Sequence, residues 1–380
     1  MRLGLYIHIP FCRSLCHYCD FPRRAYDPEM AQKFVKALLV EARRRAERPL
    51  ARRSVVDTIY MGGGTPTCLP PRLLKRIVKA IFDCFEVLPD AEFTVEANPE
   101  SATYDLLSAL RGMGVNRISI GAQTFDPRIL RTIGRAHAPE DIGRAVEDAR
   151  RAGFENVNLD LIYGLPGQTL KGFLLDLERA LSLRPQHLSL YALSLHKGTP
   201  LHRRVLRGEV RLPSEEETAD MFEAARERLK RAGFVHYEIS NFSLPGFECK
   251  HNLKYWLGEP FLGLGPGAWS FLNGWRRGNV ADVSEYVRLL GEGREPLSEA
   301  QRPPRLRRAS ELLILGLRLV QGFDLRRLNR RYGRRVLSEF LPELRALSSE
   351  GLLILEGDMV RLSEQAIPVA NRVWERLLRG

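Results

Sequence analysis

Residues 12–19, with the sequence Cys-Arg-Ser-Leu-Cys-His-Tyr-Cys, contain three thiols separated by three and then two residues. They follow residues 5–10, an apolar run that ends in proline, which predicts a short buried strand ahead of a loop. A structural zinc site and a cluster used only for electron transfer both take four protein ligands. Three thiols around a four-iron cubane leave one iron open, and an open metal position is where a small molecule binds and reacts. The spacing therefore favours a cluster with an open iron.

Two other arrangements use the same thiols. In the first, His17 or a distant residue supplies the fourth ligand of a zinc ion. In the second, the thiols are buried and bind no metal. The spacing alone leaves both arrangements open beside the cluster.

The length of 380 residues exceeds that of a usual single core, so we expect two or three structural units. No run of eighteen apolar residues occurs, and no membrane-spanning segment is expected. The first residues lead directly into the strand, so neither a signal peptide nor a transit peptide is expected. Six cysteines in a chain of this length are not a disulfide framework, and free thiols beside a cluster suit the reducing cytoplasm.

Basic residues outnumber acidic ones, 58 against 46, which gives a net charge of +12. A basic surface attracts nucleic acid or an anionic membrane. Since no RNA-binding motif accompanies the charge, we expect a solvated basic surface and no nucleic-acid partner.

Six predicted strands alternate with predicted helices in the first half of the chain. This alternation favours parallel βα units, which form a barrel or part of one. The strands are expected at residues 5–10, 55–61, 92–97, 117–122, 156–162 and 187–193, and the helices at 27–48, 71–85, 104–113, 127–133, 139–152 and onward from about 170 to 183.

Polar residues and glycines occur at the carboxyl ends of these strands, where the chemistry of such barrels gathers. After the cysteine loop come the glycine run 62–64 with Thr65, then Glu96, Gln123 and Asp160 at successive strand ends. Each also has an ordinary explanation, such as a tight turn for the glycines or a satisfied loop amide for Gln123. Their common placement favours one site built from all of them.

The cysteine stretch resembles the C-x-x-x-C-x-aromatic-C motif of radical S-adenosylmethionine (SAM) enzymes, with Tyr18 as the aromatic residue. The resemblance implies a [4Fe–4S] cluster bound by Cys12, Cys16 and Cys19, whose free iron chelates the amino and carboxylate groups of SAM. One electron then cleaves the sulfonium to methionine and a 5′-deoxyadenosyl radical.

Further stretches resemble the HemN-like branch of this superfamily, and together they cover almost the whole chain. They are residues 6–12, 62–67, Glu96, 121–125, Arg135 and 160–166. The branch implies an α/β fold, with a radical SAM (β/α)6 partial TIM barrel and a C-terminal winged-helix-like α+β module. By this similarity the residues that line the SAM pocket are Tyr6, Tyr18, Gly63, Gly64, Thr65, Glu96, Gln123, Arg135 and Asp160. Carboxylates suit the ribose hydroxyls of SAM, and a guanidinium suits its carboxylate.

Two features separate this chain from the coproporphyrinogen oxidases of the branch. Those enzymes carry a fourth cysteine two residues after the third, where this chain has Phe21, and a long extension ahead of the first strand, where it has five residues before Tyr6. Both features resemble the paralogous HemW-type haem chaperones. The resemblance implies a protein that binds haem and delivers it to haem-accepting proteins, with respiratory-chain components at the membrane among the candidates. An oxygen-independent coproporphyrinogen III dehydrogenase is the alternative, and a radical SAM enzyme with another substrate is a third.

A second candidate site is residues 248–256, Glu-Cys-Lys-His-Asn-Leu-Lys-Tyr-Trp. By its chemistry alone, a histidine beside aromatic residues is more often a core residue with satisfied hydrogen bonds. The H-N-x-x-Y-W pattern, however, resembles the haem-associated motif of HemW-type proteins. The resemblance makes His251 a candidate axial ligand of haem and Cys249 a competing one. Tyr255 and Trp256 would then stack on a porphyrin face.

The arginine-rich end of the chain predicts helices, a β-hairpin and a last helix, an order that resembles a winged-helix module. The helices are expected at 310–320, 324–332, 336–351 and 365–378, and the hairpin at 352–362 with Gly-Asp at its turn. Fold alone does not establish DNA binding, and the module is expected to cover the barrel opening or to meet a partner. The predicted domains are the radical SAM core (1–235), the connecting region with the H-N-x-x-Y-W stretch (236–300) and the C-terminal module (301–380).

Overall fold

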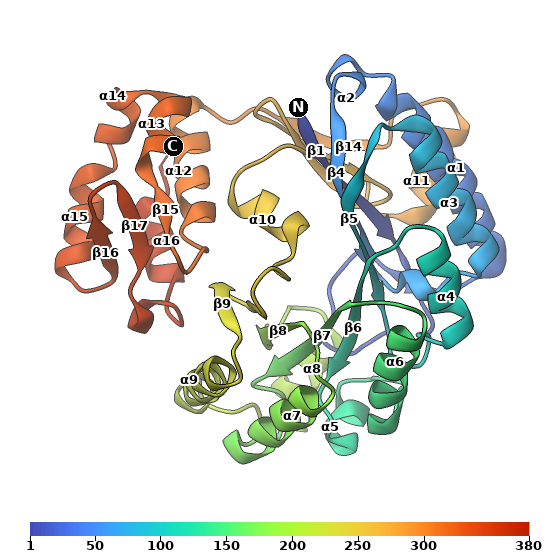
Figure 1. Ribbon diagram of the computed structural model, residues 1–380, viewed down its shortest axis with the longest axis horizontal. Coiled ribbons are helices and arrows are strands. Elements are labelled where there is room, and N and C mark those ends of the chain that lie inside the picture. The colour runs from blue at the N-terminus through green and yellow to red at the C-terminus, as the bar shows by residue number, and fades with distance from the viewer. Residues whose placement is uncertain (380) are drawn as a thin grey trace.

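A twelve-stranded sheet forms the centre of the structure, a computed structural model that describes residues 1–379 (Figure 1). Seven neighbouring strands run parallel, and antiparallel strands extend the sheet at both edges. In their order across the sheet, the parallel strands are β11 (Phe261–Leu264), β1 (Arg2–Ile9), β4 (Val55–Gly63), β5 (Val87–Ala97), β6 (Arg117–Gln123), β7 (Asn156–Tyr163) and β8 (His187–Ala192). The predicted partial barrel of parallel βα units is confirmed.

Helices that connect the parallel strands cover the outer face of the curved sheet (Figure 1). They are α1 (Pro28–Ala46), α3 (Pro71–Cys84), α4 (Tyr104–Gly112), α6 (Pro139–Arg151) and α7 (Leu170–Ser182). Such crossovers are required because a tight turn cannot join parallel strands. β6 is buried at every position, as expected for a central strand covered on both faces. No helix within residues 1–379 is long and apolar enough to cross a lipid bilayer.

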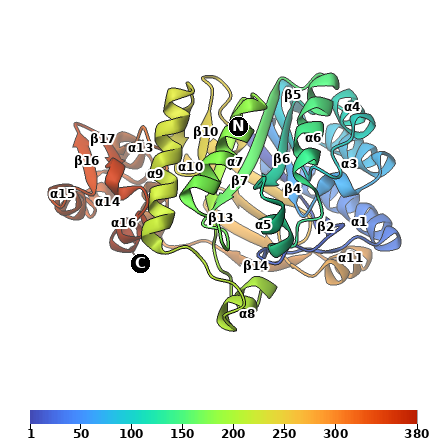
Figure 2. The ribbon, with the colours of Figure 1, turned by 90° about the horizontal axis from the view of Figure 1, so that it is seen from below.

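Shorter elements lie in the loops around the barrel. β2 (Phe11–Cys12) and β3 (Arg24–Ala25) pair at the base of the cysteine loop. α5 (Pro127–Thr132) follows β6, and α2 (Pro49–Arg52) precedes β4. α8 (Pro200–Leu206) lies on an excursion between β8 and α9 (Glu215–Arg231) that projects from the barrel (Figure 2).

The stretch predicted to connect the two larger domains contributes strands to both edges of the main sheet. β9 (Val235–Glu238) and β10 (Asn241–Ser243) extend the sheet beyond β8. β11 and three further strands extend it beyond β1, and they are β12 (Trp269–Leu272), β13 (Trp275–Asn279) and β14 (Leu297–Gln301). Between them, α10 (Lys250–Trp256) contacts β4 on one side and the C-terminal module on the other. The division of the chain at 235 and 300 stays a prediction.

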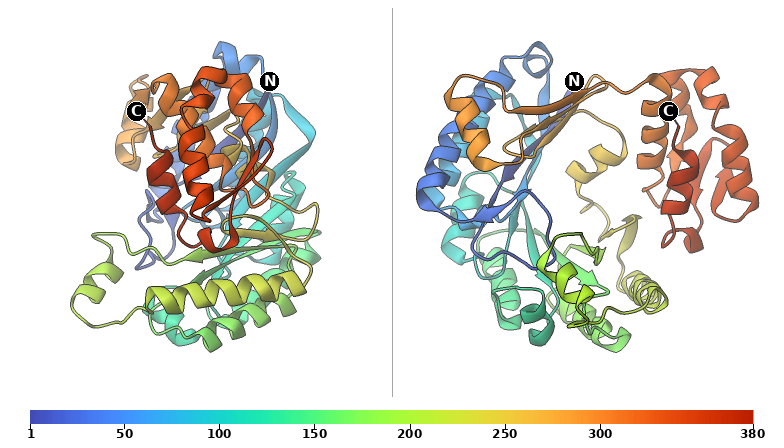
Figure 3. Two further views of the ribbon diagram at one scale, coloured as in Figure 1. Left: turned by 90° about the vertical axis from the view of Figure 1, so that its left-hand side faces the viewer. Right: turned by 180° about the vertical axis from the view of Figure 1, so that it is seen from behind.

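The C-terminal module stands beside the barrel, with α10 between the two (Figure 3). It contains α12 (Arg305–Gly316), α13 (Leu325–Tyr332), α14 (Arg334–Ser338), α15 (Leu341–Ser349), α16 (Asn371–Leu377) and the short strand β15 (Phe323–Asp324). The predicted hairpin is confirmed as β16 (Leu353–Glu356) and β17 (Met359–Leu362). The predicted helix 336–351 is wrong, because the segment divides into α14 and α15. Pro342, in the first turn of α15, has no N–H to bond the carbonyl of Ser338 and its ring clashes there, so one continuous helix cannot pass through it.

A buried carboxylate fixes α1 to the strands beyond β1. Glu41 accepts hydrogen bonds from the Gly265 N–H at 2.8 Å, the Tyr286 hydroxyl at 2.6 Å and the Asn279 amide at 2.7 Å. It also pairs with Arg45 at 3.3 Å, and the two side chains are 1% and 2% exposed. Buried charges are stable only when they are paired and hydrogen-bonded, so the cluster depends on all of its members.

Glu41→Gln should lower the free energy of unfolding by about 3 kcal/mol, because it leaves the buried Arg45 guanidinium without this carboxylate. Urea unfolding followed by circular dichroism measures the change. The matched control is Glu29→Gln on the same helix, which breaks an exposed pair with Lys33 and should leave the urea midpoint nearly unchanged. Equal stability of Glu41→Gln and the wild type would show that this cluster does not fix α1.

Candidate functional site

The carboxyl ends of the parallel strands open onto a cavity of about 420 Å³. All but two of the residues predicted for the cofactor site line it. They are Cys12, Cys16, Tyr18, Cys19, Gly63, Gly64, Thr65, Glu96, Gln123, Arg135 and Asp160. The fold therefore brings these residues together, and their individual roles in binding stay predictions.

The three thiols line this cavity from the loop that begins at β2. Cys12 is buried, whereas Cys16 and Cys19 are partly exposed. The Thr65 hydroxyl donates to the Cys12 sulfur at 3.7 Å, and the Arg135 guanidinium donates to the Cys16 sulfur at 3.4 Å. Burial raises the pKa of the Cys12 thiol to about 11.

The surroundings of the thiols fit a [4Fe–4S] cluster. Arg23 donates to the backbone carbonyls of Cys16 and Cys19, so its charge lies beside the cysteine loop. Donors and cations beside sulfur stabilise thiolates and an anionic cluster. Within residues 1–379, no group of three or more His, Cys, Asp and Glu side chains is arranged to hold a single metal ion. A cubane is a different case, because its cysteines bind different irons.

His17, the alternative zinc ligand, does not line the cavity. Its Nδ1 contacts the Thr132 carbonyl at 2.9 Å, and its ring lies against Gly134. The arrangement in which His17 completes a zinc site with the three thiols is therefore not formed.

Two partly buried carboxylates face the cavity, Glu96 from β5 and Asp160 from β7. Glu96 accepts a hydrogen bond from the Tyr60 hydroxyl at 2.7 Å. Asp160 accepts from the Ser119 hydroxyl at 3.1 Å and the Asn158 amide at 2.7 Å. Burial raises the pKa of both carboxyls, that of Glu96 to about 7. When ionised, the pair can accept hydrogen bonds from the hydroxyls of a ribose.

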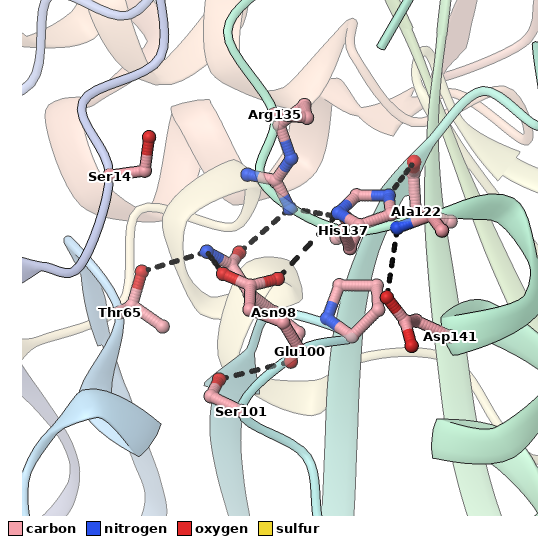
Figure 4. Close-up of polar contacts among 12 residues, drawn as sticks. Ser14, Thr65, Asn98, Glu100, Ser101, Ala122, Arg135, His137 and Asp141 are labelled. Carbon is pink, nitrogen blue, oxygen red and sulfur yellow. Dashed lines mark hydrogen bonds and ion pairs between the residues drawn. The ribbon is translucent and has the colours of Figure 1, made fainter. Parts of the chain in front are cut away.

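Arg135 connects the cysteine loop with the strand ends, since it contacts the Cys16 sulfur on one side and Asn98 on the other. Figure 4 shows the contacts on the side of Asn98. The Arg135 guanidinium donates to the Asn98 side-chain carbonyl at 2.9 Å and to the Gly121 backbone carbonyl at 2.6 Å. Asn98 in turn donates to the Thr65 hydroxyl at 3.2 Å. The Nε of Arg135 is buried and has no hydrogen-bond partner in the described part of the chain. The side chain therefore keeps capacity for an anionic group such as a carboxylate.

Close packing explains the glycines at the end of β4. A Cβ on Gly63 would lie 2.4 Å from the His8 ring, and its φ of +106° favours glycine. A Cβ on Gly62 would lie 2.6 Å from the Glu96 carboxyl, so the position of this carboxylate depends on glycine. Gln123 has a φ of 65°, which is uncommon outside glycine and strains the backbone at the cavity wall.

Tyr6 and His251 do not line this cavity. Tyr6 stacks on Tyr60 with ring centroids 6.3 Å apart, so it lies one layer behind the wall. His251 is fully buried on α10, where Nδ1 contacts the Thr58 hydroxyl and Nε2 contacts the Tyr255 hydroxyl, both at 2.8 Å. Burial lowers the pKa of His251 to about 3, so the imidazole is neutral. Its role as a haem ligand stays a prediction, and ligation would require the ring to release one of these hydrogen bonds.

Sequence reasoning missed Tyr60, Asn98 and Ser119, which also line the cavity. Tyr60 and Asn98 lie near the carboxyl ends of their strands, so the placement that singled out Glu96 would have included them. Ser119 shares a face of β6 with Gly121, because successive side chains of a strand alternate between its two faces. This alternation in the sequence could have predicted that Ser119 faces the cavity.

Known proteins match this chain along almost its whole length. Residues 6–174 match the family model of the radical SAM superfamily, and residues 304–369 match that of the HemN C-terminal domain. "Heme chaperone HemW" of Bacillus subtilis (strain 168) is 37% identical over 98% of this chain and 98% of its own. The protein of the same name from Lactococcus lactis subsp. lactis (strain IL1403) is 35% identical over 98% of this chain and 96% of its own. Among solved structures, coproporphyrinogen III oxidase (HemN) from Escherichia coli has a TM-score of 0.87 at 26% identity and covers 99% of this chain and 90% of its own.

The barrel, its three-cysteine loop and the first of these matches define a radical SAM protein. Within that class, the chain belongs to the HemW family. Membership of the superfamily implies a [4Fe–4S] cluster and SAM. The cluster supplies the electron for reductive cleavage of SAM when it is bound. Cys12, Cys16 and Cys19 are the residues that would hold it.

Replacing Cys12, Cys16 and Cys19 together with alanine should abolish cluster assembly, because no other thiol lines the cavity. After anaerobic reconstitution, iron and sulfide assays should give about four irons per wild-type chain and almost none in the variant. Cys84→Ala, on the outer helix α3, is the matched control and should keep its iron. Retention of iron and sulfide by the triple variant would place the cluster outside this cavity.

The raised pKa of Glu96 should make SAM binding depend on pH. Among the groups that face this carboxyl, Asp160 raises its pKa further, while Tyr60 and Arg117 lower it. The folded pKa lies above the ordinary value, so the carboxyl gains its proton as the pH falls through about 7. The protonated form accepts ribose hydroxyls poorly, and SAM affinity should therefore fall in the same direction.

The ratio of the SAM affinity of the wild type to that of Glu96→Gln should fall by up to about tenfold when the pH is lowered from about 8 to about 6. The variant serves as the reference because the groups of SAM that titrate affect both proteins equally. Anaerobic calorimetry on cluster-loaded protein gives the two affinities. Asp160→Asn should move the midpoint to lower pH, since it removes a charge that raises the Glu96 pKa. A ratio that does not change with pH would exclude Glu96 from SAM binding.

Proposed function

We propose that this chain binds haem and delivers it to acceptor haemoproteins, with a SAM-binding [4Fe–4S] cluster in its barrel. The observation that carries the proposal is the match to proteins named "Heme chaperone HemW", which extends over nearly the full length of both partners. A shared barrel alone would not distinguish the functions of this superfamily, but a full-length match includes both the H-N-x-x-Y-W stretch and the C-terminal module.

Phe21 supports a chaperone over an oxidase. It occupies the position two residues after the third cysteine and is 63% exposed. It lines the cavity at the carboxyl ends of the parallel strands, which is called the first cavity from here on. An apolar side chain there cannot provide the fourth thiol expected of coproporphyrinogen oxidases. The alternative activity, oxidation of coproporphyrinogen III, is favoured only by the structural likeness to HemN, at a lower identity of 26%.

The proposed acceptors are haemoproteins, and membrane-bound components of the respiratory chain are the first candidates. The proposed location is the cytoplasm. All six cysteines are free thiols, which is the state that a reducing compartment maintains. His251 and Cys249 are the candidate iron ligands from the sequence, and both are fully buried.

The cluster-loaded protein should bind about one haem per chain, with a haem absorption band that moves to an apo-cytochrome added afterwards. Under anaerobic reducing conditions with SAM, the same protein should leave coproporphyrinogen III unchanged. Coproporphyrinogen III oxidase from Escherichia coli, assayed in parallel, is the positive control for the second measurement. Conversion of coproporphyrinogen III would support the oxidase instead, and absence of haem transfer would contradict the chaperone.

A further inference from the structure

A second cavity, of about 510 Å³, lies between the barrel and the C-terminal module and shares no lining residue with the first. Its walls come from α10, from the edge strands β11 to β14 and from α12 and α13. Tyr255, which belongs to the H-N-x-x-Y-W stretch, is one of its lining residues. The volume falls within the range of about 300–1,000 Å³ that is typical of small-molecule sites.

The walls of this second cavity are mainly apolar and aromatic. The barrel contributes Phe261, Phe271 and Trp269, and α12 contributes Leu312 and Ile314. Trp269 is 42% exposed, although it lies among other aromatic residues. Such walls suit the face of a flat aromatic ligand, because ring stacking and apolar burial both favour it.

Two arginines in the wall have no carboxylate partner within residues 1–379. Arg308 has a buried Nε without a hydrogen-bond partner, and its guanidinium lies 6.0 Å from the centre of the Tyr332 ring. Arg331 donates to the Gly258 carbonyl at 2.9 Å and lies 5.8 Å from the centre of the Phe271 ring. Arg308 is partly buried, and an unpaired guanidinium in that setting favours an anionic ligand. Arg331 is exposed beside the same cavity, and a carboxylate matches the planar donors of both side chains.

The acidic residues of the same wall do not neutralise these two arginines, because they are paired with other cations. Glu311 pairs with Arg276. Glu259 pairs with Lys254 at 3.2 Å. The cavity thus keeps two positive charges available to a ligand.

We propose that the second cavity binds haem through its porphyrin face and its two propionates, with Arg308 and Arg331 as the carboxylate partners. The proposal rests on the haem-binding function proposed above and names its site. Haem combines a flat apolar macrocycle with two carboxylates on one edge. This combination matches an aromatic wall beside two unpaired guanidinium groups.

The cavity recognises the macrocycle and its carboxylates rather than the iron. None of its lining residues is His, Cys or Met. His251 lies behind the wall, where it bonds the Tyr255 hydroxyl at 2.8 Å. The Tyr255 ring packs edge-on against Phe261, with centroids 4.6 Å apart. His251 is therefore a positioning residue, which acts on haem through Tyr255.

The test compares haem, iron-free protoporphyrin IX and the dimethyl ester of protoporphyrin IX on the full-length, cluster-loaded protein. Protoporphyrin IX should bind about as tightly as haem, and the ester about tenfold or more weakly, because it lacks the carboxylates. The Arg308→Gln, Arg331→Gln double variant should bind haem and protoporphyrin IX about tenfold or more weakly than the wild type. Porphyrin fluorescence and haem absorption give the affinities.

Three controls accompany the double variant. Arg326→Gln on α13, whose side chain is 62% exposed, should bind both ligands like the wild type. Arg308→Lys keeps the charge and should retain most of the binding. Arg331 also donates to the Gly258 carbonyl, so its loss can affect folding. Iron content and thermal unfolding therefore verify that the double variant is folded. If it is unfolded, Arg308→Gln alone replaces it.

The outcomes separate this site from the proposed function. Binding of haem without binding of protoporphyrin IX would mean that iron ligation dominates, which overturns this site and leaves haem binding standing. Wild-type affinity in the folded double variant would overturn it as well. If neither haem nor protoporphyrin IX binds, the proposed function itself fails.

His251→Ala distinguishes a positioning residue from an iron ligand. It should weaken the binding of haem and protoporphyrin IX to the same degree and leave the absorption maximum of bound haem unchanged. A shifted maximum, or a loss confined to haem, would make His251 an iron ligand and overturn its assignment as a positioning residue.

Discussion

The first cavity depends on one constraint, that seven parallel strands end at the same edge of the sheet. Cys12, Glu96 and Asp160 are far apart in the sequence and meet only because of this arrangement. At the end of β4 even one additional carbon atom does not fit, because a Cβ in place of a glycine hydrogen would displace Glu96 or His8. The chemistry of the site and the packing of the barrel therefore rest on the same strand ends.

Much of this arrangement could be predicted from the sequence, because burial leaves a period of two in strands and of about 3.6 in helices. The strand–helix alternation gave the barrel, and the placement of polar residues at strand ends brought Glu96, Gln123 and Asp160 into one cavity. Arg135 came from the family resemblance alone. The prediction of one helix over 336–351 failed because apolar spacing was read without the proline at 342.

Contacts between distant segments were not predictable in the same way. Periodicity shows which face of an element is buried, but not which element covers it. β1 pairs with β11 from the other half of the chain, and Glu41 meets Asn279 and Tyr286 there. The second cavity has the same origin, since its wall joins the barrel to the C-terminal module. Nothing in the arginine-rich segment marks Arg308 as the residue whose Nε lacks a partner.

A chain of three contacting rings connects the walls of the two cavities. Tyr60 lines the first, Tyr255 lines the second, and His251 lies between them, 5.4 Å from the Tyr60 ring and hydrogen-bonded to Tyr255. A ligand in one cavity that favours one position of these rings changes the affinity of the other cavity for its ligand. The coupling free energy is the same in both directions. Two ligands bound in these cavities would therefore change each other's affinity without touching, and the affinity for one would depend on whether the other is bound.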